Sequence, residues 1–469
     1  MGAETLRPLS KECYYTHPRL WLKNISSPQP REARTISTSP AIIPRAEHNI
    51  SRSNISESAL KVLYRLTQAG YSAHLVGGGV RDLLLGREPK DFDVATDARP
   101  EEIKALFRNC RLIGRRFVLA HVRFGREIIE VATFRAQHEA ADGEGEGEGV
   151  MEDGMILRDN VFGTLEDDAW RRDFTVNALY YNVADFSVID YTDGMADLKA
   201  GVLRLIGEPG ARLREDPVRM LRAVRFAAKL GFRLHPDIEA GIHELGELLT
   251  AVPPARLFDE VLKLFQGGYA VQGYELLRHY GLFGYLFPQT EACLAEEEND
   301  FPHTLLLKAL GNTDARIAVG KPVTPAFLFA ALLWDPVRQA AARLREAGMS
   351  ELQALQAASQ DVISEQTRRV TFPKRFSIQS REIWTLQARL PQRAGKRALR
   401  LFEHPRFRAA YDFLLLRAEA GEDVSELAEW WTRFQEVDHE ARLKMSSEVK
   451  GSSGKRRKRR RRKRPAASS

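Results

Sequence analysis

Residues 75–96 constrain the fold more than any other stretch of the chain. They begin as LVGGGVRD at Leu75 and end as DFDVAT at positions 91–96. The first part has the order of a buried strand, a glycine turn and the start of a helix, and the second is typical of a short strand. Side chains two residues apart share one face of a strand. We therefore expect Asp91 and Asp93 to point the same way while Phe92 enters the core.

Two carboxylates on one face of a strand repel each other unless a cation lies between them. Oxygen ligands suit Mg²⁺, which also takes substrate phosphates as ligands, and metal ions can activate an attacking hydroxyl and stabilise a leaving pyrophosphate. An Asp-x-Asp pair alone is more often an exposed turn. The glycine turn before it favours the metal site, because Gly77 and Gly78 let the backbone approach a phosphate, and Arg81 offers a bidentate contact.

The composition predicts a multidomain protein without a membrane span. A length of 469 residues favours two to four domains, and no apolar run approaches the roughly 18–20 residues that cross a bilayer. The N-terminus lacks the layout of a secretion signal. Cys13, Cys110 and Cys293 form neither a metal pattern nor an even disulfide set. These features together predict a reducing, cytoplasmic compartment.

The net charge of +7 is concentrated in the tail of the chain. Residues 455–464 are ten consecutive Lys and Arg residues, so the remaining chain carries −3, the difference between +7 and these ten charges. Ser, Pro, Thr and Arg dominate residues 1–52, which predicts disorder there. The alternating Glu and Gly of residues 139–154 predict a mobile loop. From residue 166 onward helical periodicity dominates, and we expect RRDFTVNALYY (171–181) to be helical.

Four ordered stretches resemble one known family. They are GGGVRD (77–82), DFDVAT (91–96), RRDFTVNAL (171–179) and EDPVRMLRAVRFAAKLG (215–231). The chain is similar, over roughly residues 45–430, to the class II nucleotidyltransferases, which hold the tRNA CCA-adding enzymes and the bacterial poly(A) polymerases. This resemblance implies an α+β protein with a small mixed-sheet, polymerase-beta-like head and an all-α neck and body. The boundaries we expect are a disordered segment 1–52, the catalytic head 53–200, the neck 201–270, the body 271–440 and a disordered basic tail 441–469.

The resemblance also implies roles for individual residues. Asp91, Asp93 and Asp173 would be catalytic, with the first two holding Mg²⁺, or Mn²⁺ in its place, and ATP would be the substrate. The nucleotide-binding set would comprise Gly77, Gly78, Arg81, Arg172, Glu215, Asp216, Arg219 and Arg222, of which Glu215, Asp216 and Arg219 would read the incoming base by its hydrogen-bonding edge.

The residues themselves leave three alternatives open. Asp173 has the position of a helix N-cap, which Asp fills well. Arg219, Arg222 and Arg225 recur every three residues, as on a solvated helix face. Glu130 interrupts the apolar strand EIIEVATF (127–134), where a charge is costly unless it is exposed or used. It is either a cleft acid that supports the metal site or an edge-strand acid that faces water.

Two observations favour the poly(A) polymerase branch. GRRFVLAHV (114–122) resembles the stretch that marks this branch, and residues 366–408 hold twelve Lys or Arg against two Glu. Such a stripe attracts phosphates without reading sequence. We expect RNA contacts from Arg368, Arg369, Lys374, Arg375, Arg393, Lys396, Arg397, Lys455, Arg456 and Arg457.

The function predicted from the sequence is template-independent transfer of AMP from ATP to RNA 3′ ends, which makes poly(A) tails that influence RNA turnover. The expected partners are mRNA and other transcripts, together with RNA-degradation or RNA-chaperone proteins. A CCA-adding tRNA nucleotidyltransferase is the alternative on the same fold. A non-catalytic RNA-binding protein is the alternative from another class.

Overall fold

A computed structural model describes residues 39–114, 118–136, 151–152, 155–156, 161–295 and 304–449. Residues 1–40 and 41–469 form separate units, and the fold below is that of the second unit. Within the described part no helix is long and apolar enough to cross a membrane. The expected loop 139–154 and the ten basic residues 455–464 lie outside the described residues, apart from the short strand β7 (Met151–Glu152).

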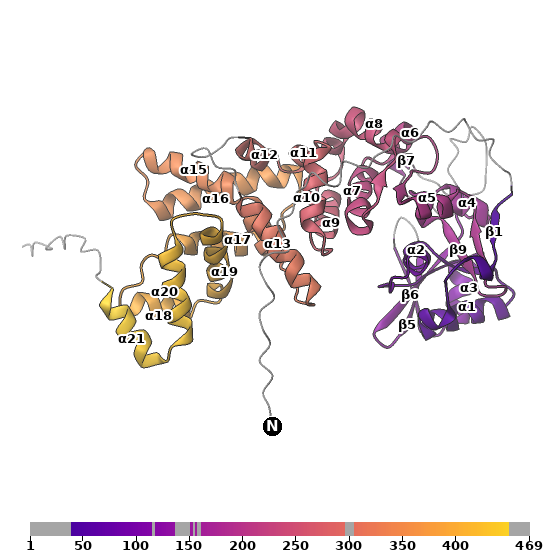
Figure 1. The fold of residues 1–469 in the computed structure, drawn as a ribbon, viewed down its shortest axis with the longest axis horizontal. Coiled ribbons are helices and arrows are strands. Elements are labelled where there is room, and N and C mark those ends of the chain that lie inside the picture. Colours follow the sequence, from indigo (N-terminus) through magenta and orange to yellow (C-terminus); the bar gives the residue numbers. More distant parts are fainter. Residues whose placement is uncertain are drawn as a thin grey trace, which may run out of the picture. The chain divides into compact units, whose positions relative to one another are not determined.

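An eight-stranded mixed sheet forms the N-terminal part of this unit (Figure 1). Its order is β1-β10-β9-β2-β3-β6-β5-β4, and β3 and β6 are the parallel neighbours. The strands are β1 (Ala41–Ile43), β2 (Ala73–Val76), β3 (Asp93–Thr96), β4 (Cys110–Ile113), β5 (Leu119–Phe124), β6 (Glu127–Thr133), β9 (Leu179–Asn182) and β10 (Val188–Asp190). Four short strands pair outside it, β7 with β8 (Met155–Ile156) and β11 (Val202–Leu203) with β12 (Arg233–Leu234).

Two helices cover one face of the sheet, and the other face carries the acidic residues. On the covered face, α1 (Glu57–Gln68) and α3 (Pro100–Leu106) pack against strands through Val62, Val94 and Val131, all of them buried. A smaller cluster on the opposite face contains Ala95 of β3, and side chains alternate along a strand. Asp93, two residues before Ala95, therefore belongs to this second face.

The remaining helices of the sheet region lie in its connections. They are α2 (Gly78–Leu84), α4 (Leu165–Trp170), the 3₁₀ turn η4 (Thr175–Asn177) and α5 (Gly194–Ala200), after the N-terminal 3₁₀ turns η2 (Arg45–Glu47) and η3 (Arg52–Asn54). The helix α2 begins directly after Gly77, whose positive φ of 73° favours glycine. The expected order of strand, glycine turn and helix is therefore present.

Apart from β12, all the elements described from residue 209 onward are helices. They are α6 (Pro209–Glu215), α7 (Val218–Leu230), α8 (Pro236–Leu245), η5 (Gly246–Ala251), α9 (Pro254–Phe265), α10 (Ala270–His279), α11 (Phe283–Leu286), α12 (Pro288–Leu294), α13 (Leu305–Ala318), α14 (Pro325–Leu332), α15 (Trp334–Glu346), α16 (Glu351–Arg369), α17 (Lys374–Gln387), α18 (Lys396–Phe402), α19 (Phe407–Glu419), α20 (Ser425–Glu436) and α21 (His439–Glu448). The predicted α+β class is confirmed.

Three expectations about local structure are wrong. Residues 41–43 form an edge strand and Ile50 is fully buried, so the ordered part begins before residue 53. The helix α21 extends into the segment expected to be a disordered tail. Residues 179–182 form a strand and not a helix, because β9 lies between β2 and β10, where its tyrosines are buried on both faces. Pairing partners far along the chain decide this last case.

Candidate active site

The glycine turn, the aspartate pair and one arginine meet at the end of β2. A Cβ placed on Gly77 would lie 3.6 Å from Arg172 Nη1 and 3.9 Å from Asp93 Oδ2. A Cβ on Gly79 would lie 3.4 Å from the carbonyl oxygen of Asp91. The backbone of the turn therefore runs directly beside residues 91–93, the last of which begins β3. In this arrangement backbone N–H groups, a guanidinium and carboxylates surround one small region, as recognition of a metal–triphosphate group requires.

Asp93 lies in an environment that disfavours its negative charge. Burial, followed by the nearby Asp91 and Glu130 carboxylates, raises the pKa of Asp93 to about 6, and Arg172 acts against this rise. Carboxylates this close together repel each other, and a divalent cation bound between them would remove that repulsion. Among the described residues, no group of three or more His, Cys, Asp or Glu side chains is arranged to hold a metal ion.

Glu130 faces the same region from the neighbouring strand. It is the register partner of Asp93 in the parallel pair β3–β6, and its carboxylate lies 3.2 Å from His121 Nε2 on β5. Its side chain is 48% exposed, so it is open to solvent as well as to the Asp93 side. The strand β6 pairs with β3 and β5 and is not an edge strand, so the alternative of an edge-strand acid is wrong. Glu130 remains a candidate for the support of a metal.

Arg172 is held in place by two side chains that sequence reasoning missed. Asp168 Oδ2 accepts hydrogen bonds from Arg172 Nη2 at 2.9 Å and from the Tyr180 hydroxyl at 2.7 Å. Arg171 also donates to Asp168. Burial alone would raise the pKa of Asp168, but Arg172, Arg171 and Tyr180 outweigh it and hold that pKa well below the usual range. The signal in the sequence was an acid four residues before an arginine in a helix.

Asp173 binds an arginine of the following helical region and does not cap a helix. Its Oδ2 accepts hydrogen bonds from Arg222 Nε at 2.8 Å and Nη2 at 2.5 Å, while its Oδ1 accepts from the backbone N–H of Phe174 and from Asn177. Burial opposes the charge, yet Arg222 and these donors lower the pKa of Asp173. It is therefore ionised and tied to α7.

Arg81 is buried and paired with side chains of the protein. Its side chain is 2% exposed, and it donates to Asp82 Oδ1 at 2.6 and 2.8 Å and to Asn177 Oδ1 at 2.6 Å. The guanidinium thus joins α2 to η4 and is not presented to solvent. A Cβ placed on Gly78 would lie 3.6 Å from Arg81 Nη2, so this arginine also lies beside the glycine turn. Its role as a triphosphate ligand stays a prediction.

The EDPVR segment begins the helix α7. Asp216 Oδ1 accepts from the backbone N–H of Val218 at 3.2 Å, while its Oδ2 accepts from Arg256 Nη2 at 2.5 Å. Arg219 Nη1 donates to Glu215 Oε2 at 2.8 Å and to the carbonyl oxygen of Arg212 at 2.6 Å. These contacts fix the Arg219 guanidinium. A fixed guanidinium is what reading a base edge requires.

The three arginines of α7 do not form a solvated face. Arg219 pairs with Glu215, Arg222 with Asp173 and Arg225 with Glu260, and their side chains are 11%, 31% and 13% exposed. All the carboxylate partners come from outside α7. The helical spacing of these arginines therefore reflects internal ion pairs.

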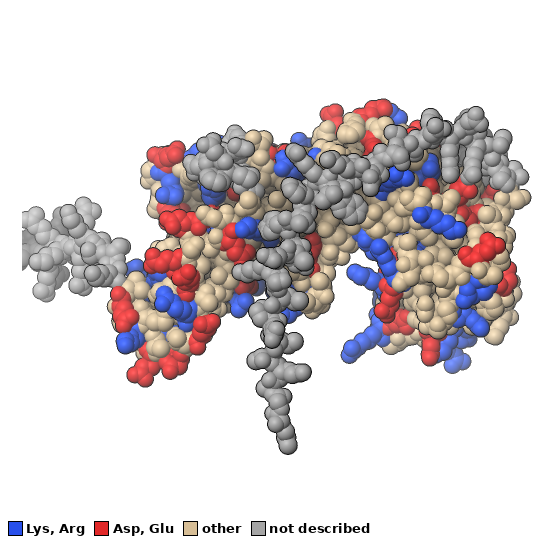
Figure 2. Space-filling view, in the orientation of Figure 1, with Lys and Arg blue, Asp and Glu red and all other residues tan. Residues whose placement is uncertain are grey.

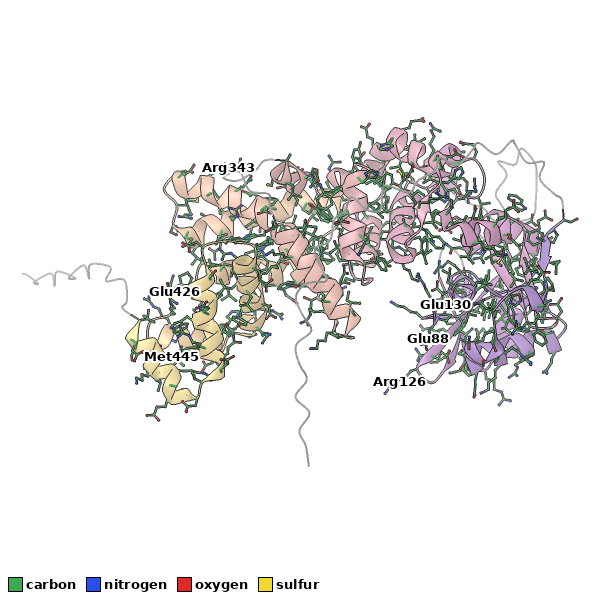
Figure 3. All side chains as sticks on the ribbon, viewed as in Figure 1. Glu88, Arg126, Glu130, Arg343, Glu426 and Met445 are labelled. Carbon is green, nitrogen blue, oxygen red and sulfur yellow. The ribbon has the colours of Figure 1, made fainter. Side chains whose placement is uncertain are left out.

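The expected RNA contacts of the body occupy several different environments. Arg368, at the end of α16, is 74% exposed, and Lys374 and Arg375 begin α17. Arg393, by contrast, lies against Trp430 and pairs with Glu426 of α20 at 3.5 Å (Figure 3). Acidic and basic side chains alternate on the visible face of α18–α21 (Figure 2). Lys455, Arg456 and Arg457 lie outside the described residues.

Comparison with known proteins defines the class first. The fold is that of the nucleotidyltransferases: the solved CCA-adding enzyme of Bacillus stearothermophilus in complex with CTP matches with a TM-score of 0.53 and 27% identity, covering 82% of each chain. Residues 73–204 match the family described as "Poly A polymerase head domain". Residues 231–294 match "Probable RNA and SrmB- binding site of polymerase A", and residues 347–465 match "Polymerase A arginine-rich C-terminus".

The relatives place the chain within that class. Poly(A) polymerase I of Escherichia coli O6:H1 is 52% identical over 426 residues, which is 90% of this chain and 92% of the relative. The CCA-adding enzyme of Lactobacillus gasseri is 40% identical over 207 residues, which is 44% of this chain and 49% of the relative. The chain therefore belongs to the bacterial poly(A) polymerase family of nucleotidyltransferases. The prediction of a polynucleotide adenylyltransferase is confirmed at this level.

Proposed function

We propose that this protein transfers AMP from ATP to the 3′-hydroxyl of RNA without a template strand, releases pyrophosphate and so makes poly(A) tails. The observation that supports this function best is the meeting of Gly77, Asp93 and Arg172 at one end of the sheet. It provides a backbone turn and a cation for phosphates beside a pair of metal-binding carboxylates. Such a reaction depends on positioning and charge stabilisation more than on covalent chemistry.

Each residue of the site has a distinct task in this proposal. Asp91 and Asp93 would hold Mg²⁺ or Mn²⁺, which when bound lowers the pKa of the 3′-hydroxyl and neutralises the triphosphate. The turn at Gly77 and Gly78 admits the triphosphate close to the backbone. Arg172 Nη1, the guanidinium nitrogen without a hydrogen bond to another described residue, donates to it. Asp173 acts by holding Arg222 in place.

Nucleotide choice would rest on the first turn of α7. Arg219 cannot swing freely, because Glu215 and the Arg212 carbonyl both accept from its Nη1. A guanidinium held in one orientation offers the same donors to each incoming base, so it can select one base edge repeatedly. Product and substrate then present the same 3′ end, and addition of A can continue.

The proposed polymer substrate is the 3′ end of mRNA and other transcripts. The family description of residues 231–294 as an RNA-binding site supports this choice, as do the twelve basic residues within 366–408. RNA-degradation or RNA-chaperone proteins are the proposed protein partners. Cys110 and Cys293, the cysteines among the described residues, are not joined by a disulfide, which accords with the reducing, cytoplasmic compartment that we propose.

A nucleotide-incorporation assay tests the function directly. Purified protein is incubated with Mg²⁺ and a tRNA that lacks its CCA end, or with an oligoadenylate, and with either ATP or CTP alone. The expected result is repeated AMP addition to both RNAs and little use of CTP. Two CMP additions to the tRNA followed by a stop would identify a CCA-adding enzyme, and RNA binding with no incorporation of either nucleotide would leave the non-catalytic alternative.

A further inference from the structure

A groove of about 400 Å³ lies in the helical body, lined mostly by the basic stretch 366–408 but by none of the residues singled out above as RNA contacts. It is formed by α16, α17 and the segment before α19, and its lining includes Ile378, Arg381, Glu382, Thr385, Arg389 and His404. We call it the α16–α17 groove. Its volume falls within the roughly 300–1,000 Å³ typical of sites for small ligands or single nucleotide units.

The groove carries positive charge that the protein does not neutralise. Arg389 is partly exposed, and its side chain forms no hydrogen bond or ion pair with another described residue. Arg381 donates to the neutral amide oxygen of Gln360 at 2.6 Å, so its charge is not compensated there. The one carboxylate in the lining, Glu382, accepts from Arg406 at 3.2 Å. Two guanidinium charges therefore remain available to an anion.

A hydrogen-bond donor and an apolar surface lie beside these charges. His404 Nδ1 accepts from the backbone N–H of Arg406 at 3.1 Å, so in the neutral ring the proton is on Nε2, which is a donor. Ile378, one turn before Arg381 on α17, is 48% exposed although it is a large aliphatic side chain. Phosphate, a hydrogen-bonding edge and an apolar ring face occur together in a nucleotide.

We propose that the α16–α17 groove binds one or two nucleotides of single-stranded RNA behind its 3′ end, with Arg381 and Arg389 on phosphates and a base against Ile378. This inference rests on the proposed function and adds a site to it. The charge balance favours RNA over a protein partner of mixed charge, because no free carboxylate lines the groove. Such a site would hold the growing tail while its last nucleotide takes part in the reaction.

The test compares three variants of the full chain in binding and catalysis. The double variant Arg381→Gln with Arg389→Gln removes both charges, Ile378→Ser removes the apolar contact, and Arg343→Gln with Arg345→Gln removes two exposed charges from α15 as a matched control (Figure 3). Fluorescence anisotropy gives the Kd for labelled 25-nucleotide oligoadenylate without ATP at several salt concentrations. Thermal unfolding checks that every variant folds.

We expect the groove double variant to bind the oligoadenylate about tenfold more weakly than the wild type does. The slope of its log Kd against log salt concentration should be smaller by about 1.4, or roughly 0.7 for each lost phosphate contact. Ile378→Ser should weaken binding with the slope unchanged, and the α15 control should match the wild type. In tailing assays the KM for RNA should rise while kcat and the KM for ATP do not change. If the wild type adds no AMP, the proposed function fails, yet the ATP-free binding assay still tests the groove.

Two results would overturn the proposal. One is a Kd of the folded groove variant within twofold of the wild type with the same salt slope. The other is binding of a labelled polyglutamate peptide to the wild type but not to the variant, with equal RNA binding by both, which would assign the groove to an acidic protein segment.

Discussion

Asp168 forms a buried ion pair with Arg172, in which Arg172 Nη2 lies 2.9 Å from Asp168 Oδ2. The Tyr180 hydroxyl donates to the same oxygen at 2.7 Å and accepts from Arg172 Nε at 2.9 Å. These hydrogen bonds occupy Nε and Nη2 of the Arg172 guanidinium, and Nη1 remains beside Gly77. An acid on α4 and a tyrosine on β9 thus determine where the proposed triphosphate contact points.

Asp168→Asn and Tyr180→Phe should lower kcat/KM for ATP by about 10–100-fold, because a misplacement of about 1 Å near the reacting groups can cost that much. The effect should appear mainly in the KM for ATP, with little change in RNA affinity. Steady-state kinetics at varied ATP and a separate RNA-binding assay check this. The exposed Glu166→Gln on the same helix is the matched control.

Asp168→Asn can destabilise the fold more than Tyr180→Phe does. The test therefore uses both variants. Removal of one partner from a buried pair can cost about 3–5 kcal/mol, so Asp168→Asn needs a measured Tm, whereas Tyr180→Phe keeps the ion pair and the ring. If folded Tyr180→Phe and Asp168→Asn both keep kcat/KM for ATP within twofold of the wild type, the positioning role is wrong.

Local patterns predicted much of the active-site strand and turn. The glycine turn at Gly77 and the alternation of Asp91, Phe92 and Asp93 depend on neighbours in the chain, and the structure has this turn with Phe92 buried. The helix α7 starts at Val218, whose N–H donates to Asp216, and Gly231 follows its last residue, Leu230, with a positive φ. Short-range chemistry of this kind can be seen in one sequence.

Contacts between distant residues explain what the sequence could not show. Arg81 donates to Asn177, 96 positions away, and the residues around Arg81 give no sign of this partner. Residues 179–182 have a helical pattern in isolation, but pairing with β2 and β10 makes them a strand. Tertiary pairing overrides local preference at such positions.

Asp91→Ala and Asp93→Asn should each reduce AMP incorporation by at least about 10³-fold, because the carboxylate pair supplies the main electrostatic stabilisation in the proposed reaction. RNA affinity should stay within about threefold of the wild type. Mg²⁺ or Mn²⁺ should raise the Tm of the wild type in the presence of ATP but not that of the variants. Activity within tenfold of the wild type in either variant would refute the metal assignment.

The same aspartate predicts an effect on stability without metal. The neighbouring Asp91 and Glu130 carboxylates help to raise the pKa of Asp93, after burial itself, so its charge is unfavourable in the metal-free protein. Asp93→Asn should therefore be at least as stable as the wild type at pH 8 in EDTA. A clear fall in Tm under these conditions would show that Asp93 has a structural role instead.

His74 should make folding stability fall in acid. The ring is 6% exposed, near the rings of Phe134 and Tyr180, and burial lowers its pKa to about 4. Between pH 6.5 and 4 the His74 imidazole is protonated in the unfolded chain but mostly neutral in the folded chain. The free energy of unfolding therefore decreases as the pH falls from 6.5 towards 4. At pH 4.5 the loss from this one group is about 2–3 kcal/mol.

Chemical unfolding of the wild type and His74→Gln at pH 7.5, 6 and 4.5 measures this contribution. The wild type should lose about 2–3 kcal/mol more than His74→Gln over this range, while His439→Gln, at an exposed position of α21, should follow the wild type. Parallel pH profiles for wild type and His74→Gln would mean that the imidazole is not held neutral in the folded protein.

The basic tail should set the salt dependence of RNA binding rather than the rate of the reaction. Residues 455–464 carry ten positive charges, and each phosphate that they neutralise adds about 0.7 to the salt slope for a single strand. Replacement of these ten residues by Gly and Ser at the same length should weaken RNA binding at 50 mM salt. It should also reduce the slope of log Kd against log salt concentration by several units. Turnover at saturating RNA should stay within twofold, because no residue of the proposed active site changes. Removal of the uncharged residues 465–469 is the control, and an unchanged slope in the Gly and Ser variant would show that the tail does not contact RNA phosphates.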